Sequence, residues 1–145
     1  MDPSTIFQVF GIEAQLGVLG LVLVLLDVTL GRGKLTGPAS AVRLVTFGGL
    51  IGILAASFWV EPVVDNAWGQ LDLFALFFKR FFLGAALLTL AISGPYEDRI
   101  PAGRGEFPAL LVFTTLGMCM LASVNDYVSL FVGLELVTIT LFLMS

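Results

Sequence analysis

The sequence predicts an all-α protein, a polytopic bundle of about five transmembrane helices. Hydrophobic residues make up 58% of the chain and charged residues only 12%, whereas soluble domains carry about 25% charged residues. Several apolar runs approach the roughly 20 residues that a helix needs to cross the hydrocarbon core of a bilayer. We therefore expect an integral membrane protein with a single transmembrane domain over residues 1–145, incomplete at its C-terminus.

The first predicted helix covers residues 11–30 and carries charge only near its two ends. Glu13 lies in its first turn and Asp27 in its last, so both side chains can reach an aqueous interface. We interpret them as solvated helix ends in preference to proton-binding sites. The first five residues include an acid and no Lys or Arg, which argues against a cleaved secretory signal.

The second predicted helix, residues 41–60, has small residues spaced four apart on one face. Such a stripe allows a neighbouring helix to approach closely. Its members are Gly48, Gly52 and Ala56.

The third predicted helix, residues 73–93, contains two adjacent basic residues about seven positions beyond Asp72. Long side chains at this depth can extend back to the lipid headgroups. Neighbouring residues on a helix also point to different sides, so Lys79 and Arg80 cannot both face one channel. We favour snorkelling over a role in an ion pathway.

The last two predicted helices cover residues 107–123 and 126–145, joined by a tight turn in which Asp126 is the N-cap. Glu135 is the one charged residue in the apolar run that follows. It lies about 13 Å beyond Asp126 along a helix axis, close to the bilayer midplane. An acidic residue there costs about 2.5–3.5 kcal/mol on insertion scales, so Glu135 is a candidate functional residue.

The distribution of basic residues orients the predicted helices. Lys and Arg flank the first and third loops, whereas the second loop, the fourth turn and the N-terminus have none. Positive residues mark the cytoplasmic side, so the N-terminus should lie outside and the fifth helix should run inward. The basic residues counted are Arg32, Lys34, Arg43, Arg99 and Arg104.

The residue types that are missing restrict the chemistry of this chain. It has no His and only one Cys, Cys119, so it cannot by itself ligate haem or an iron–sulfur cluster, build a Cys/His zinc site or close an internal disulfide. We expect no cofactor and no metal in this chain, and we interpret Cys119 as a small core residue.

Several short motifs stand in the second half of the chain: DLFALFFK at 72–79, RGEFPALL at 104–111, TLGM at 115–118, ASVND at 122–126 and LFVGLEL at 130–136. With these motifs the second half of the chain resembles subunit N of the respiratory NADH:quinone oxidoreductase, complex I. The LF-x-GLEL motif after a short ASxND turn carries most of the resemblance, and residues 1–69 share only the layout.

The resemblance implies a proton-translocating, antiporter-like membrane subunit of a redox-driven enzyme. In that family the glutamate matching Glu135 is thought to pair with a lysine on a later broken helix and to relay protonation changes. A cation that approached Glu135 would favour release of its proton, and withdrawal of the cation would favour uptake of a proton by Glu135. Thr138, one turn on, could hydrogen-bond the carboxyl group or a nearby water. The family often has Pro where this chain has Thr140, so the kink of the family does not carry over by resemblance, whereas the carboxylate does.

The same resemblance implies partners and a location. FMN, iron–sulfur clusters and quinone are expected on partner subunits, which would include neighbouring antiporter-like and small membrane subunits. The lipid bilayer is the other expected partner, and no nucleic acid is expected. The resemblance implies the bacterial cytoplasmic (inner) membrane, with the N-terminus on the periplasmic side.

Two other functions remain open on the sequence. One is a subunit of a multi-subunit cation/proton antiporter, and the other is a non-catalytic assembly scaffold in which Glu135 anchors a buried salt bridge. Subunit N normally has about fourteen helices, and its partner lysines would lie beyond Ser145. We therefore expect this chain to be an N-terminal portion.

Overall fold

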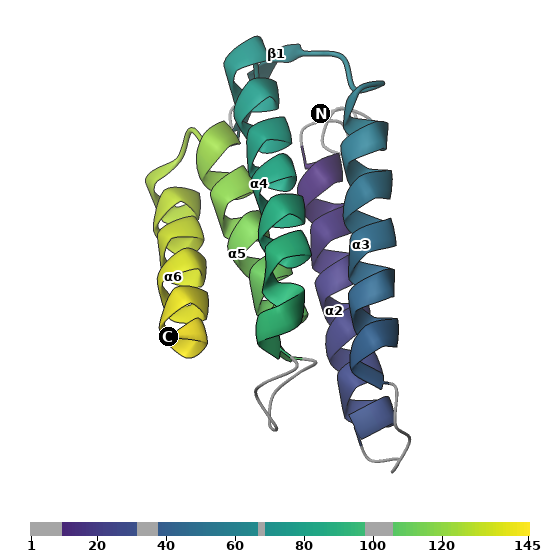
Figure 1. Cartoon of the computed structure of the whole chain (residues 1–145). Coiled ribbons are helices and arrows are strands. Elements are labelled where there is room, and N and C mark those ends of the chain that lie inside the picture. Colours follow the sequence, from purple (N-terminus) through teal and green to yellow (C-terminus); the bar gives the residue numbers. More distant parts are fainter. Residues whose placement is uncertain (1–9, 32–37, 67–68, 98–105) are drawn as a thin grey trace.

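The protein is an up-and-down bundle of membrane helices, seen in a computed structural model that describes residues 10–31, 38–66, 69–97 and 106–145 (Figure 1). Of the helices in the described residues, α2, α4, α5 and α6 are long and apolar enough to cross a membrane. The prediction of an all-α, polytopic membrane bundle is therefore confirmed. The helices are α2 (Gly11–Gly31), α3 (Pro38–Ser57), α4 (Leu73–Glu97), α5 (Glu106–Ser123) and α6 (Tyr127–Met144).

The second helix is shifted from its predicted range. It begins at Pro38 because proline, which has no backbone N–H, suits the first turn of a helix. It ends at Ser57, and the backbone N–H groups of Phe58 and Trp59 then bond to carbonyls three residues earlier, both at 3.1 Å. Such bonds form a tighter 3₁₀-type turn. The apolar part of α3, Ala41–Ser57, is shorter than the other spans.

A short β-hairpin connects α3 to α4, where the sequence was expected to form only a loop. Strands β1 (Val63–Asn66) and β2 (Gly69–Leu71) pair antiparallel, with Val63 opposite Leu71 and an irregular register between the two ends. The two adjacent valines at 63–64 favour a strand. The hairpin lies at the end of the bundle where α4 begins (Figure 1).

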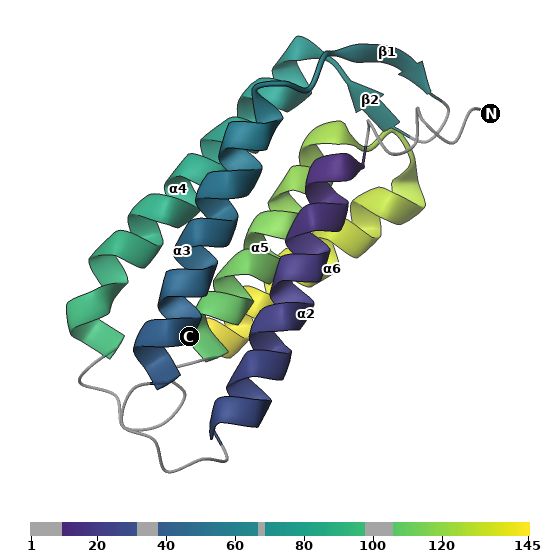
Figure 2. The same cartoon turned by 90° about the vertical axis from the view of Figure 1, so that its right-hand side faces the viewer.

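Helix α5 is the centre of the bundle. It packs against α2, α4 and α6, and more narrowly against α3. Half of its span is buried inside the structure, compared with 11% of the α6 span. Figure 2 shows α5 lying among the other helices, and Figure 1 shows α6 at the outer edge beside it. The α6 helix therefore presents most of its surface away from the described bundle.

The close contact between α5 and α6 involves glycines that the sequence did not single out. A Cβ atom on Gly117 of α5 would lie 2.7 Å from a methyl group of Val137 and 3.1 Å from the Gly133 carbonyl of α6. By contrast, Gly48 and Gly52 are exposed, and a Cβ atom added at either would have nothing within 4 Å. The predicted small-residue stripe on α3 is therefore wrong as a contact among the described helices.

An arginine joins α3 to α4 at the end of α4. Arg43 donates from its Nη2 atom to the carbonyls of Leu90 at 2.8 Å and Ala91 at 3.2 Å. Helix α4 continues through Pro95, which has no backbone N–H to bond the carbonyl four residues earlier. The Arg43 guanidinium thus supplies the hydrogen bond that the Ala91 carbonyl lacks within its own helix.

Candidate functional site

Glu135 lies near the middle of α6, eight residues beyond Tyr127, which is about 12 Å along the helix axis. Its side chain is exposed and forms no hydrogen bond or ion pair with any described residue. The contact face of α6 explains this position. Gly133 and Thr140 are buried against α5, and Glu135 is about 200° around the helix from Gly133 at 3.6 residues per turn.

The start of α6 is fixed by its predicted N-cap. Asp126 accepts hydrogen bonds from the backbone N–H groups of Val128 at 2.9 Å and Ser129 at 3.0 Å, and from the Ser129 hydroxyl. The Ser129 hydroxyl bond, followed by the two N–H groups, lowers the pKa of Asp126 below its usual range. The N-cap prediction is confirmed, and the cap sets where the helix carrying Glu135 begins.

Thr138 is exposed on the Glu135 side of α6, one turn further along. Its hydroxyl donates to the Leu134 carbonyl at 2.8 Å. The hydroxyl proton is therefore committed to the backbone, and only the oxygen is left to accept a bond from water or from a protonated carboxyl group. A supporting role for Thr138 stays a prediction.

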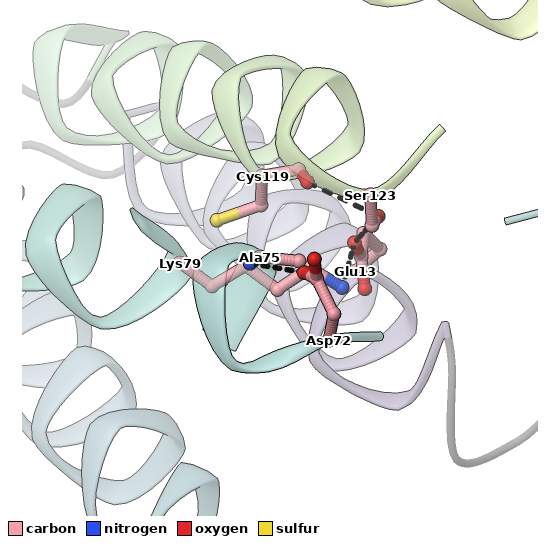
Figure 3. Close-up of polar contacts among 6 residues, drawn as sticks. All are labelled: Glu13, Asp72, Ala75, Lys79, Cys119 and Ser123. Carbon is pink, nitrogen blue, oxygen red and sulfur yellow. Dashed lines mark hydrogen bonds and ion pairs between the residues drawn. The ribbon is translucent and has the colours of Figure 1, made fainter. Parts of the chain in front are cut away.

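A second charged site lies inside the bundle. The Lys79 Nζ atom of α4 is 2.6 Å from the Glu13 Oε1 atom of α2, and the side chains are 0% and 6% exposed. Ser123, the last residue of α5, donates from its hydroxyl to the same Oε1 atom at 3.1 Å. Figure 3 shows the three side chains converging from three helices, with Cys119 beside them. Cys119 is a free, buried thiol.

Two sequence interpretations are wrong at this site. Glu13 is not a solvated helix end, and Lys79 does not extend to the headgroups, because each is buried against the other. Glu13 was judged by its depth in the helix, and for Lys79 the direction of its side chain was used only to argue against a channel shared with Arg80. The face of the helix decides instead: Lys79 occupies a stripe of α4 whose other positions are buried, namely Leu76, Leu83, Ala86 and Leu90. Exposed apolar residues of α4 repeat at the same i, i+3, i+4 spacing, as at Phe74, Phe77 and Phe81, so the spacing alone does not identify the buried face.

Arg80 points to a different neighbour from Lys79, as the sequence predicted. Its Nη2 atom donates to the Ser57 carbonyl at the end of α3 at 2.8 Å. Its guanidinium carbon lies 4.7 Å from the centre of the Phe58 ring, a cation–π contact. Arg80 therefore binds the C-terminus of α3, where a cation is favoured by the helix dipole.

The described residues contain no group of three or more His, Cys, Asp or Glu side chains that could hold a metal ion. Among the basic residues used to orient the helices, Arg32, Lys34, Arg99 and Arg104 lie outside the described residues.

The chain is similar to subunit N of NADH-quinone oxidoreductase from several bacteria, although no family model matches it. Subunit N of NADH-quinone oxidoreductase from Heliobacterium modesticaldum is 46% identical over 99 residues, which cover 66% of this chain and 21% of the relative. The subunit N proteins of Moorella thermoacetica and Rhodospirillum rubrum are 41% and 37% identical, over 89% and 92% of this chain.

The matched region is a limited part of each relative. The chain spans 27% of the Moorella protein and 28% of the Rhodospirillum protein. The similarity covers nearly the whole of this chain. It therefore includes the N-terminal helices, where the sequence motifs had indicated only a shared layout. The chain belongs to the NADH-quinone oxidoreductase subunit N family.

Proposed function

We propose that this chain is part of a proton-translocating membrane subunit of NADH:quinone oxidoreductase and that Glu135 carries the proton. The observation that supports this most directly is a carboxylate in the middle of a membrane helix, on the face turned away from the helix's only extensive packing partner among the described residues, α5. The curated relatives described above carry the name of a subunit of that enzyme, which favours it over a cation/proton antiporter.

The surroundings of Glu135 would make its charge sensitive to a nearby cation. The exposed neighbours on α6 include Phe131, Leu134 and Ile139, so the carboxylate is set in an apolar surface. In such a setting an ionised carboxylate is costly without a positive partner, and a cation at hydrogen-bonding distance favours the charged form. Approach of a cation would release a proton from Glu135, and its withdrawal would let the carboxylate take up a proton.

The remaining parts of the proposal concern the complex. Quinone reduction, with its FMN and iron–sulfur clusters, would take place on partner subunits, and neighbouring antiporter-like and small membrane subunits would contact this one. The bundle would lie in the bacterial cytoplasmic membrane with the start of α2 toward the periplasmic side.

Replacing Glu135 with Gln tests the proposal, because Gln keeps the size and hydrogen-bonding capacity but cannot take part in proton transfer. We expect the assembled complex carrying Glu135→Gln to move fewer protons per NADH oxidised in membrane vesicles. Glu106→Gln, at an exposed acid in the first turn of α5, is the matched control and should leave pumping unchanged.

Normal proton yield with Glu135→Gln would rule out the proposed role. A lower amount of assembled complex with an unchanged proton yield per complex would instead support the scaffold alternative.

A further inference from the structure

The Glu13–Lys79 ion pair is a site separate from Glu135. It joins α2 to α4, and both helices pack on α5. Helix α6 packs on α5 at the outer edge of the bundle (Figure 1), so α5 stands between the pair and the helix that carries Glu135. The function proposed above does not use this pair, although it is the most deeply buried charge in the described residues.

An ion pair at this position contributes little to the stability of helix packing. Moving two charges out of water is costly, and apolar residues of similar volume often replace a buried pair without loss of stability. The same stripe of α4 is otherwise apolar, with Leu76 and Leu83 on either side of Lys79. Ionisable residues inside membrane spans mark ion or proton pathways by default, so the charges here call for an explanation beyond packing.

The carboxylate of Glu13 is also incompletely hydrogen-bonded. Its Oε1 atom accepts from both Lys79 and Ser123, whereas the buried Oε2 atom has no hydrogen-bond partner among the described residues. An ionised carboxylate offers about four lone-pair sites on its two oxygens. An unsatisfied buried oxygen is unfavourable, and this oxygen is the position at which the Glu13 carboxylate has room for a proton.

We propose that Glu13 and Lys79 form a second proton-exchanging site of this subunit. With Glu13 as carboxylate and Lys79 as ammonium, the pair has no net charge. A hydronium ion transfers one proton to the Oε2 atom, which leaves a water molecule and produces a carboxylic acid beside the ammonium, with a net charge of +1 on the pair. Return of the proton to water restores the hydronium ion and the carboxylate. Each transfer breaks one O–H bond and forms another, and no electron is transferred. This idea rests on the proposed function, since it assumes that the subunit carries protons.

Among the described residues, the nearby polar groups on α5 are neutral and the nearby charged groups have contacts of their own. On α5, Ser123 supplies a neutral hydroxyl and Cys119 a thiol (Figure 3). Asp72, at the start of α4, has a carboxylate oxygen bound to a backbone N–H of its own helix. Arg43, the charged side chain described on α3, is bound to carbonyls near the other end of α4, and Arg80 is turned toward the end of α3.

A cavity lies close to the chain segment that carries Glu13. It has a volume of about 320 Å³ between the start of α2 and the end of α3, and its lining includes Ile12, Gln15 and Ser57. Glu13 does not itself line the cavity but follows Ile12 in the first turn of α2. A space large enough for several water molecules therefore adjoins the helical turn that carries Glu13.

The test is a neutral pair placed in the full-length subunit of the assembled complex. Glu13→Gln and Lys79→Met alone each break the ion pair from one side and should lower the amount of complex. The double variant Glu13→Gln/Lys79→Met removes both charges and should restore assembly. In the double variant we expect proton transfer through this subunit to slow by about 100-fold, which is the lower end of what a positioned acid–base group contributes. The measurement is the number of protons moved per NADH oxidised, which should fall.

A second variant covers the case in which the double variant fails to assemble. Lys79→Arg keeps the positive charge, and a guanidinium fork can bind both carboxylate oxygens at once. It should retain the ion pair while holding Glu13 ionised, so assembly persists and proton yield falls. Thr115→Val, at a buried threonine of α5 whose hydroxyl bonds only its own helix, is the control for disturbing the interior.

Full proton yield from an assembled double variant or from an assembled Lys79→Arg variant would overturn the proposal and leave the pair a structural contact. Glu135→Gln, measured in the same series, separates the two ideas. A loss with Glu135→Gln alone supports the proposed function and refutes the second site. A loss with the Glu13–Lys79 variants alone supports the second site and refutes the role of Glu135.

Discussion

Glu13 and Glu135 are the same residue type in two apolar helices, yet the bundle treats them in opposite ways. Glu13 is 6% exposed and bound by a lysine and a serine from two other helices, whereas Glu135 is exposed on α6 with no described partner. The difference does not come from depth along the helix. It comes from the helix face: the Glu13 face turns into the bundle, and the Glu135 face turns away from α5.

This contrast separates two ways in which a membrane protein can carry a carboxylate. A carboxylate bound to a lysine within the same bundle is part of the packing, so its charge and the stability of the helices are linked. A carboxylate on an outward face leaves the packing of its own helix intact. Its charge is then free to respond to groups that the bundle itself does not supply.

The contrast between Glu13 and Glu135 is tested most strongly by removing charge at each site in turn. Lys79→Met leaves Glu13 as a buried carboxylate without a cation among the described residues, which should cost about 3–5 kcal/mol in the free energy of unfolding of the full-length subunit. Glu135→Gln disturbs none of the described contacts and should cost less. The measurement is denaturation of the purified subunit in detergent, and equal losses from the two variants would erase the contrast.

The packing that turns Glu135 outward can be tested through the glycines. Gly117→Ala would place a methyl group 2.7 Å from a Val137 methyl group, and such overpacking typically costs about 1–3 kcal/mol. Gly48→Ala, on an open face of α3, is the matched control and should stabilise the helix by up to about 1 kcal/mol. If both substitutions had the same effect on thermal unfolding, the close approach of α5 and α6 would be wrong.

The smallest expected effect concerns the cap of α6. The pKa of Asp126 is lowered in the folded protein, so its contribution to stability is fully present above the unfolded-state pKa and is lost as the pH falls through the lower folded value. The unfolding temperature should therefore decrease as the pH is lowered through the acidic range. In Asp126→Asn, which keeps an accepting oxygen but cannot titrate, this part of the pH dependence should be absent.

Composition and apolar run length were enough to predict the membrane bundle, and the Asp126 cap was readable because capping depends on residues next to one another. The position of Glu135 within its helix was equally local. Its exposure was not, since it depends on Gly117 and Gly133 allowing α5 to cover the opposite face. Glycines in apolar runs are common, and the sequence drew attention to Gly48 and Gly52 instead.

The Glu13–Lys79 pair was beyond the sequence interpretation for a different reason. The two residues lie on helices that are separated along the chain by all of α3, and only the packing of α2 and α4 on α5 brings them together. The burial of Lys79 could not be predicted from its own stripe, because exposed positions of α4 such as Phe77 and Phe81 are equally apolar. Its partner could not be predicted either, because Asp27 was an equally acidic candidate on the same helix.

The close approach of Gly117 and Gly133 also limits how α6 can move. With backbone and side-chain atoms this near, α6 cannot roll about its own axis against α5 without pushing the Val137 side chain or a carbonyl into the neighbouring helix. The direction of Glu135 is thereby fixed relative to the rest of the bundle. Any change in the partner of this carboxylate must then arise from a rotamer change of its own side chain or from movement of the partner.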